Sequence, residues 1–296
     1  MLPSLESLRM TLRTANEDCF EVIDSVATDE GTVVEIIQYR QLEGSSDVRT
    51  AENLFFAIQS GMKLKMVRIR LNDSHVRVEP GALYYMKGNL ETRASTGGGF
   101  LKGLARRFTS GESFFVNEIH GVGEIYLEPT FGHFFLHRID ESEGGVVVDK
   151  GLFYAGTAGL DITATAQKSL SSAVLGKEGL FQTRIAGTGI AVLYSPVPRK
   201  EIQRQDLVNE KLWVDGNFVL MRSDSVSFRV EKSSKSWLAT SVSGERMLQT
   251  FEGMGFVWIA PTQGIYERLA SPEGLQDLAV PPGSHDTETQ SLPDAS

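Results

Sequence analysis

The sequence predicts an all-β protein. Three observations carry this prediction: abundant glycine, runs of β-branched and aromatic residues, and a strand–Gly-x-Gly–strand unit that occurs three times. The chain has 296 residues, of which 29 are glycine and 41% are hydrophobic, enough for a sizeable core. Many short apolar runs separated by turn residues favour sheets over helical bundles.

The repeated unit is centred on a Gly-x-Gly whose first glycines, at positions 121, 187 and 253, are 66 residues apart in both intervals. Apolar residues stand at even offsets on both sides, which is the period of one strand face. We expect the glycines to permit a bend or a bulge between two strand arms. Three such units would form stacked sheets that share one core. The aligned apolar positions are Phe115, Ile119, Ile125 and Leu127; Phe181, Ile185, Ala191 and Leu193; and Met247, Phe251, Val257 and Ile259.

Further strands and turns follow from local composition. Pro80-Gly81, Lys150-Gly151 and Asp215-Gly216 each predict a turn before a strand. Residues 31–39 are rich in β-branched side chains and predict a strand. Another strand is expected over 64–71, where basic residues change parity midway. We interpret it as a solvated edge strand rather than an anion-binding strip.

The chain is expected to comprise an N-terminal extension (1–16), a single all-β domain (17–272) and a disordered acidic tail (273–296). From Asp277 onward the tail contains three prolines, several acids and no Lys or Arg. This composition is typical of disorder.

The N-terminal extension carries an amphipathic pattern. Leu5, Leu8 and Leu12 form one face of a short helix, with Arg9 and Arg13 opposite. A mitochondrial presequence has a similar pattern, but acidic residues at positions 6, 17 and 18 interrupt the basic ones here.

Charge and cysteine content restrict the partners and the compartment. The net charge of −9 argues against a strong nucleic-acid binder, which needs a positive surface. The single cysteine, Cys19, indicates a reducing compartment, so a cytoplasmic location is expected, with Cys19 as a small buried hydrophobe. No stretch reaches the roughly 18 apolar residues of a membrane-spanning helix.

Catalytic, cofactor and metal sites are not predicted, and neither is enzymatic activity. A dinucleotide fingerprint needs a third glycine and a following helix, whereas strand residues follow each Gly-x-Gly. His133 and His137 are four residues apart and share a strand face. Glu141 would join them as a metal ligand only if the strand continued through Asp140, which we do not expect.

The segment 97–108 is the surface candidate for ligand or membrane contact. Leu101, Leu104 and Phe108 are spaced as one helix face, and basic residues lie largely elsewhere on the turn. Such a helix more often caps the open end of a sandwich. The candidate contact residues are Gly97, Gly98, Gly99, Lys102, Arg106 and Arg107.

Four segments together match the pattern of a known family: Glu79-Pro-Gly-Ala-Leu-Tyr-Tyr-Met-Lys-Gly, Gly97-Gly-Gly-Phe-Leu-Lys-Gly-Leu-Ala-Arg-Arg-Phe, Gly111-Glu-Ser-Phe-Phe and Phe251-Glu-Gly-Met-Gly-Phe-Val-Trp-Ile. On these segments the chain resembles the altered-inheritance-of-mitochondria protein 24 family over residues 55–265. The resemblance implies a β-sandwich related to the tryptophan RNA-binding attenuation protein fold and to double-stranded β-helix folds, with no established enzymatic activity.

These observations predict a non-enzymatic scaffold or interaction protein that forms homo-oligomers through its sheet edges. The alternative is a binding module for an anionic ligand, either RNA or a membrane surface, that uses segment 97–108. The protein partner and the process served stay open.

Overall fold

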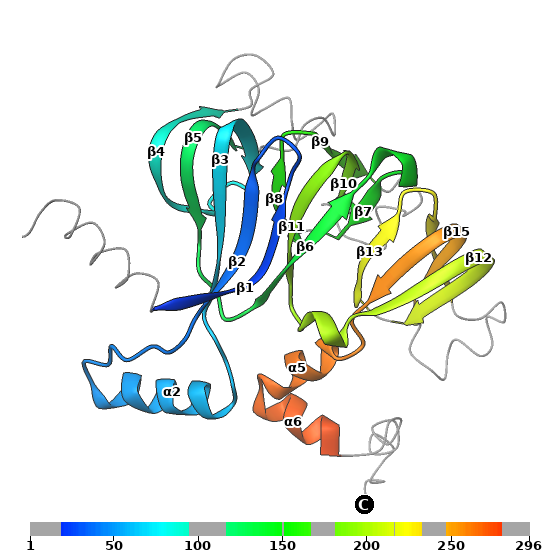
Figure 1. Ribbon diagram of the computed structural model, residues 1–296. Helices are drawn as coiled ribbons and strands as arrows, with labels where there is room; N and C mark the ends of the chain where they lie inside the picture. Colours follow the sequence, from blue (N-terminus) through cyan, green and yellow to red (C-terminus); the bar gives the residue numbers. More distant parts are fainter. Residues whose placement is uncertain are drawn as a thin grey trace, which may run out of the picture.

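The computed structural model describes residues 19–94, 117–149, 151–166, 181–215, 217–232 and 247–279. These residues form two curled antiparallel sheets, with helices at one end of the molecule (Figure 1). The all-β class is therefore confirmed. Helix α2 spans Val48–Gln59, α5 spans Gln263–Leu269, α6 spans Pro272–Ala279, and short 3-10 helices η1 and η2 span Glu141–Glu143 and Arg199–Glu201. No helix in the described part of the chain is long and apolar enough to cross a membrane.

The first sheet has the strand order β1-β2-β3-β8-β11-β6, and β5 joins β3 to β4. Its strands are β1 Phe20–Ala27, β2 Val33–Tyr39, β3 Lys65–Val78, β4 Leu83–Ala94, β5 Asn117–Leu127, β6 His133–Ile139, β8 Phe153–Thr157 and β11 Gly189–Ser195.

The second sheet has the order β12-β15-β13-β7-β10-β9, and β14 pairs with β15. Its strands are β7 Val146–Val148, β9 Leu160–Ala166, β10 Phe181–Gly187, β12 Gln203–Asp215, β13 Val219–Ser223, β14 Ser227–Lys232 and β15 Met247–Ile259. The chain passes between the sheets at five connections of the described strands: β6 to β7, β7 to β8, β8 to β9, β10 to β11 and β11 to β12.

Among the described residues the hydrophobic core is divided into three clusters, so the expectation of one shared core is wrong. Strand β11 forms part of the wall between two of them, because Ile190 and Val192 face one cluster and Ala191 and Leu193 face the other. A strand buried on both faces reads as a continuous apolar run, which Gly189–Ser195 does. The third cluster lies among β12, β14 and β15.

The Gly-x-Gly glycines act as the expected bends. Gly121 has φ +125° and Gly187 has φ +93°. A Cβ on Gly121 would collide with the carbonyl oxygen of Asn89 in β4, and a Cβ on Gly187 with that of Gly159 in the turn before β9. The first and third motifs lie inside the continuous strands β5 and β15, whereas the second is the corner between β10 and β11. The threefold repetition in space stays a prediction.

Three local expectations are corrected. Strand β3 is not an edge strand, because β2 and β5 both pair with its basic N-terminal half, where Arg68 and Arg70 bind Glu35. Cys19 is exposed rather than buried, because it directly precedes the edge strand β1. Helix α6 occupies residues 272–279, where the disordered tail was expected to begin; Pro272 at its first position and Glu273 are ordinary helix-start signals. Residues 1–16 and the rest of the tail lie outside the described residues.

Candidate functional site

The predicted contact residues Gly97, Gly98, Gly99, Lys102, Arg106 and Arg107 lie outside the described residues. The chain leaves the described structure after Ala94 at the end of β4 and returns at Asn117 in β5, and these two residues pair directly. The described surface beside this segment is therefore the outer face of β3, β5 and β4.

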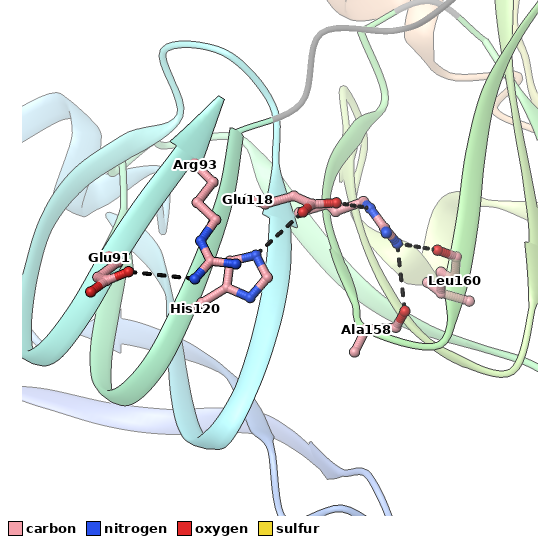
Figure 2. Close-up of polar contacts among 7 residues, drawn as sticks. Glu91, Arg93, Glu118, His120, Ala158 and Leu160 are labelled. Carbon is pink, nitrogen blue, oxygen red and sulfur yellow. Dashed lines mark hydrogen bonds and ion pairs between the residues drawn. The ribbon is translucent and has the colours of Figure 1, made fainter. Parts of the chain in front are cut away.

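Two cross-strand rows of polar side chains cover this face. Strand pairing places His75 opposite His120 and His120 opposite Glu91. It likewise places Glu118 between Arg77 and Arg93, two residues away along each of the three strands (Figure 2). Alternate residues of these strands, such as Val76 and Ile119, point into the core. The period of two thus separates a buried apolar face from a polar outer face.

A shallow pocket of about 400 Å³ opens over these rows. A bulge in β3 between Leu71 and Ser74 shapes one wall, and there Asp73 adopts the left-handed conformation with φ +50°. Such bulges re-aim side chains next to functional sites in many proteins. The pocket is lined by Asp73, Ser74, His75, Asn89, Glu91, Arg93, His120 and Gly121.

The charged groups in and beside the pocket form a connected network. The Arg77 Nε donates to Glu118 Oε1 at 2.8 Å, and the other carboxylate oxygen lies 3.3 Å from His120 Nε2 (Figure 2). Partial burial raises the pKa of Glu118, but the charge and hydrogen bond of Arg77 outweigh it, so the pKa is below its ordinary value. Partial burial, Arg77 and His120 together lower the pKa of His75.

The imidazole rings of His75 and His120 are stacked, with centroids 4.8 Å apart and planes 22° apart. Ring nitrogen lone pairs lie in the ring plane, so nearly parallel stacked rings do not converge on one metal ion. Accordingly, no group of three or more His, Cys, Asp or Glu side chains is arranged to hold a metal within the described ranges. The carboxylates of Asp73 and Glu91 also offset the charge of Arg93. The pocket alone therefore does not select an anion, and anion binding by segment 97–108 stays a prediction.

His137, one of the two histidines weighed as metal ligands from the sequence, lies in the seam between the two sheets. His137 in β6 packs edge-on against Trp258 in β15, with ring centroids 5.3 Å apart. Arg199 lies over the Trp258 ring at 4.1 Å and Arg204 over the Phe256 ring at 4.3 Å. Burial, followed by these two positive charges, lowers the pKa of His137 to about 4. This environment keeps the imidazole neutral and makes it a packing group.

A second surface, which the sequence analysis missed, is apolar. Helices α2, α5 and α6 project at the same end of the molecule (Figure 1). None of the residues of α2 is buried, although the helix is rich in apolar side chains. The sequence signal was present: Asp47 caps a helix whose Val48, Ala51, Phe55 and Ile58 share one face. We call residues 48–62 and 263–279, which comprise α2 with the turn after it, α5 and α6, the helical end. Its exposed apolar side chains are Val48, Phe55, Phe56, Ile58, Met62, Ile265, Tyr266 and Leu269.

The fold and these surfaces define a curled, two-sheet β protein with one polar pocket described on its face and an apolar helical end. The chain belongs to the family described as Mitochondrial biogenesis AIM24, whose model matches residues 56–262. The match confirms the family resemblance seen in the sequence. None of the curated proteins matches the chain.

One similar solved structure is the X-ray crystal structure of protein SPYM3_0169 from Streptococcus pyogenes. The two share 21% sequence identity with a TM-score of 0.54, over 73% of this chain and 95% of that chain. At this identity the similarity concerns the fold alone.

Proposed function

We propose that this protein is a non-enzymatic interaction protein that self-associates through its helical end. The observation that supports the proposal is α2, which buries none of its residues and exposes 57% of Phe55 and 61% of Phe56. Large aromatic side chains are enriched at protein interfaces, and gathered apolar side chains on a surface mark interaction sites.

Two edge strands, β1 and β12, are less suited to self-association than the sequence led us to expect. Edge strand β1 contains a bulge between Val22 and Asp24. Edge strand β12 contains another between Val208 and Glu210, where Asn209 has φ +58°. Bulges and charged side chains discourage pairing between edges of different molecules. The helical end has no strand edge, and its exposed charges, such as Arg49 and Glu52, lie beside large exposed apolar side chains.

Light scattering over a roughly hundredfold concentration range tests the proposal. The wild-type mass should rise with concentration, and the double variant Phe55→Ser/Phe56→Ser should stay monomeric. The matched control is Val208→Ser/Met254→Ser, which removes two exposed apolar side chains from the β12–β15 face and should associate like the wild type. A wild-type chain that remains monomeric throughout would overturn the proposal, as would equal loss of association in the control.

A further inference from the structure

Helix α2 presents an exposed apolar stripe along one face. Val48, Ala51, Phe55 and Ile58 follow the spacing i, i+3, i+7 and i+10 and are all exposed. This is the seam pattern of one helix that packs against another. The side of α2 that meets the sheet overlaps the stripe only at Ile58. Leu54, Ala57 and Ile58 line a narrow groove with Tyr39, Leu64 and Phe131, whereas Val48, Ala51 and Phe55 do not line it.

The N-terminal segment, residues 1–18, joins the described structure beside the C-terminal end of α2. The carbonyl of Cys19 accepts a hydrogen bond from the Arg40 backbone N–H at 3.0 Å. The carbonyl of Arg40 in turn accepts one from Lys63 Nζ at 2.7 Å, and Lys63 lies three residues beyond Ser60, the C-cap of α2. The segment therefore joins the described structure near the C-terminal end of α2.

The length and pattern of this segment fit the stripe. Leu5, Leu8 and Leu12 repeat the i, i+3, i+7 spacing of Val48, Ala51 and Phe55. As a helix, residues 5–12 would be about 12 Å long, against about 18 Å for α2. The six residues 13–18 can span about 20 Å when extended, which is enough to reach from Cys19 to the stripe.

We propose that residues 1–18 dock on the α2 stripe, parallel to α2, with Leu12 beside Ile58 and Leu5 beside Ala51, so that the two contact positions are seven residues apart in each segment. A tethered segment acts at an effective concentration in the millimolar range, well above the concentration of a second copy in dilute solution. The docked segment covers part of the helical end and so limits self-association. This last consequence rests on the proposed function, whereas the docking itself does not.

Hydrogen exchange of the full chain tests the docking at concentrations where light scattering shows monomers. The variant is Leu5→Ser/Leu8→Ser/Leu12→Ser. The matched control is Glu6→Ser/Met10→Ser, two positions that would lie away from the leucines in a helix. We expect amides of α2 to exchange about tenfold faster or more in the leucine variant. They should be unchanged in the control, and β3 should be unchanged in both. Unchanged α2 exchange in the leucine variant overturns the docking.

Disulfide trapping tests the register in a Cys19→Ser background. The pair Leu12→Cys/Ile58→Cys should cross-link readily, and Leu5→Cys/Ile58→Cys should not; the reverse result overturns the parallel arrangement.

The light-scattering series separates the regulatory consequence from the proposed function. Tighter self-association of the leucine variant than of the wild type supports both the proposed self-association and its inhibition by the docked segment. Weaker association overturns the inhibitory role, because the segment then belongs to the interface. If no chain associates while α2 exchange rises, the docking stands and the proposed self-association fails.

Discussion

Gly121 illustrates how a single residue allows two strands to bend together. Its φ of +125° lies in a region that L side chains rarely adopt, and its missing Cβ leaves room for the carbonyl oxygen of Asn89 in β4. The hairpin of β4 and β5 can therefore curl around the core without losing its register.

Gly121→Ala should lower the free energy of unfolding by at least about 2 kcal/mol, because both backbone strain and the collision with Asn89 oppose it. Urea unfolding measures this change. Gly44→Ala is the control: nothing lies within 4 Å of its added Cβ and its φ is unremarkable, so the change should stay within about 0.5 kcal/mol. Equal effects of the two substitutions would contradict the role of Gly121.

His137 makes the stability of the seam between the sheets dependent on pH. Its pKa is about 4 in the folded protein, against 6.5 for an ordinary histidine. The unfolded chain therefore binds the proton more tightly. The stabilisation is fully present above pH 6.5 and is lost as the pH falls towards 4, by up to roughly 3 kcal/mol.

The variant His137→Phe keeps a ring against Trp258 and Phe256 but cannot be protonated. The difference in unfolding free energy between the wild type and this variant should change steeply between pH 6.5 and 4 and level off above pH 6.5. Denaturant titrations across this range measure it. A difference independent of pH would show that His137 is not the responsible group.

At the scale of elements, Arg77 fastens the end of β3 to the turn between β8 and β9. Its guanidinium donates to Glu118 and to the carbonyls of Ala158 and Leu160. Its side chain is 24% exposed, so these contacts are only partly screened by water. The planar fork of arginine meets both sets of acceptors together.

Arg77→Ala should lower the free energy of unfolding by about 1–3 kcal/mol, since it leaves acceptors at a partly buried junction without their donor. The free energy of unfolding of Arg77→Lys should lie between those of the wild type and Arg77→Ala, because an ammonium group reaches only one side of the junction. Arg93→Ala is the control: its side chain is 64% exposed and its pair with Glu91 measures 3.5 Å. It should change stability by less than about 0.5 kcal/mol. Denaturant titrations measure the free energy of unfolding of all three variants. An Arg77→Ala variant as stable as Arg93→Ala would contradict the role of Arg77 at this junction.

At the scale of the whole molecule, the two sheets depend on each other. One core cluster combines Phe135, Leu193 and Phe153 of the first sheet with Val148 and Trp258 of the second. Neither sheet can expose its side of this cluster without removing apolar contacts from the other.

We therefore expect the two sheets to unfold in a single cooperative transition. Far-UV circular dichroism follows both sheets, and the fluorescence of Trp258, which is 5% exposed, follows the seam. The two signals should give coincident denaturation midpoints. A Trp213→Phe/Trp237→Phe variant leaves Trp258 as the single tryptophan of the sequence, so that its fluorescence follows the seam alone. Separate midpoints would show that the sheets unfold independently.

The local patterns of the sequence were sufficient to predict the all-β class and to predict which strand faces around the glycines are buried. Ile119, Ile185 and Phe251 are buried as their even offsets predicted. These features depend on neighbours in the chain, whose periodicity is visible in the sequence. The family resemblance was equally visible in its motifs.

Only the tertiary structure decided which strands pair and which faces remain uncovered. The sequence predicted an edge strand at β3, but β5, about fifty residues later in the chain, pairs with it. His137 and Trp258 are far apart in the sequence, yet their contact determines the pKa of the histidine. The α2 stripe has the pattern of a buried helix face, and periodicity alone cannot show that the described residues leave it exposed. Contacts between distant residues settle pairing and burial, and local patterns do not contain them.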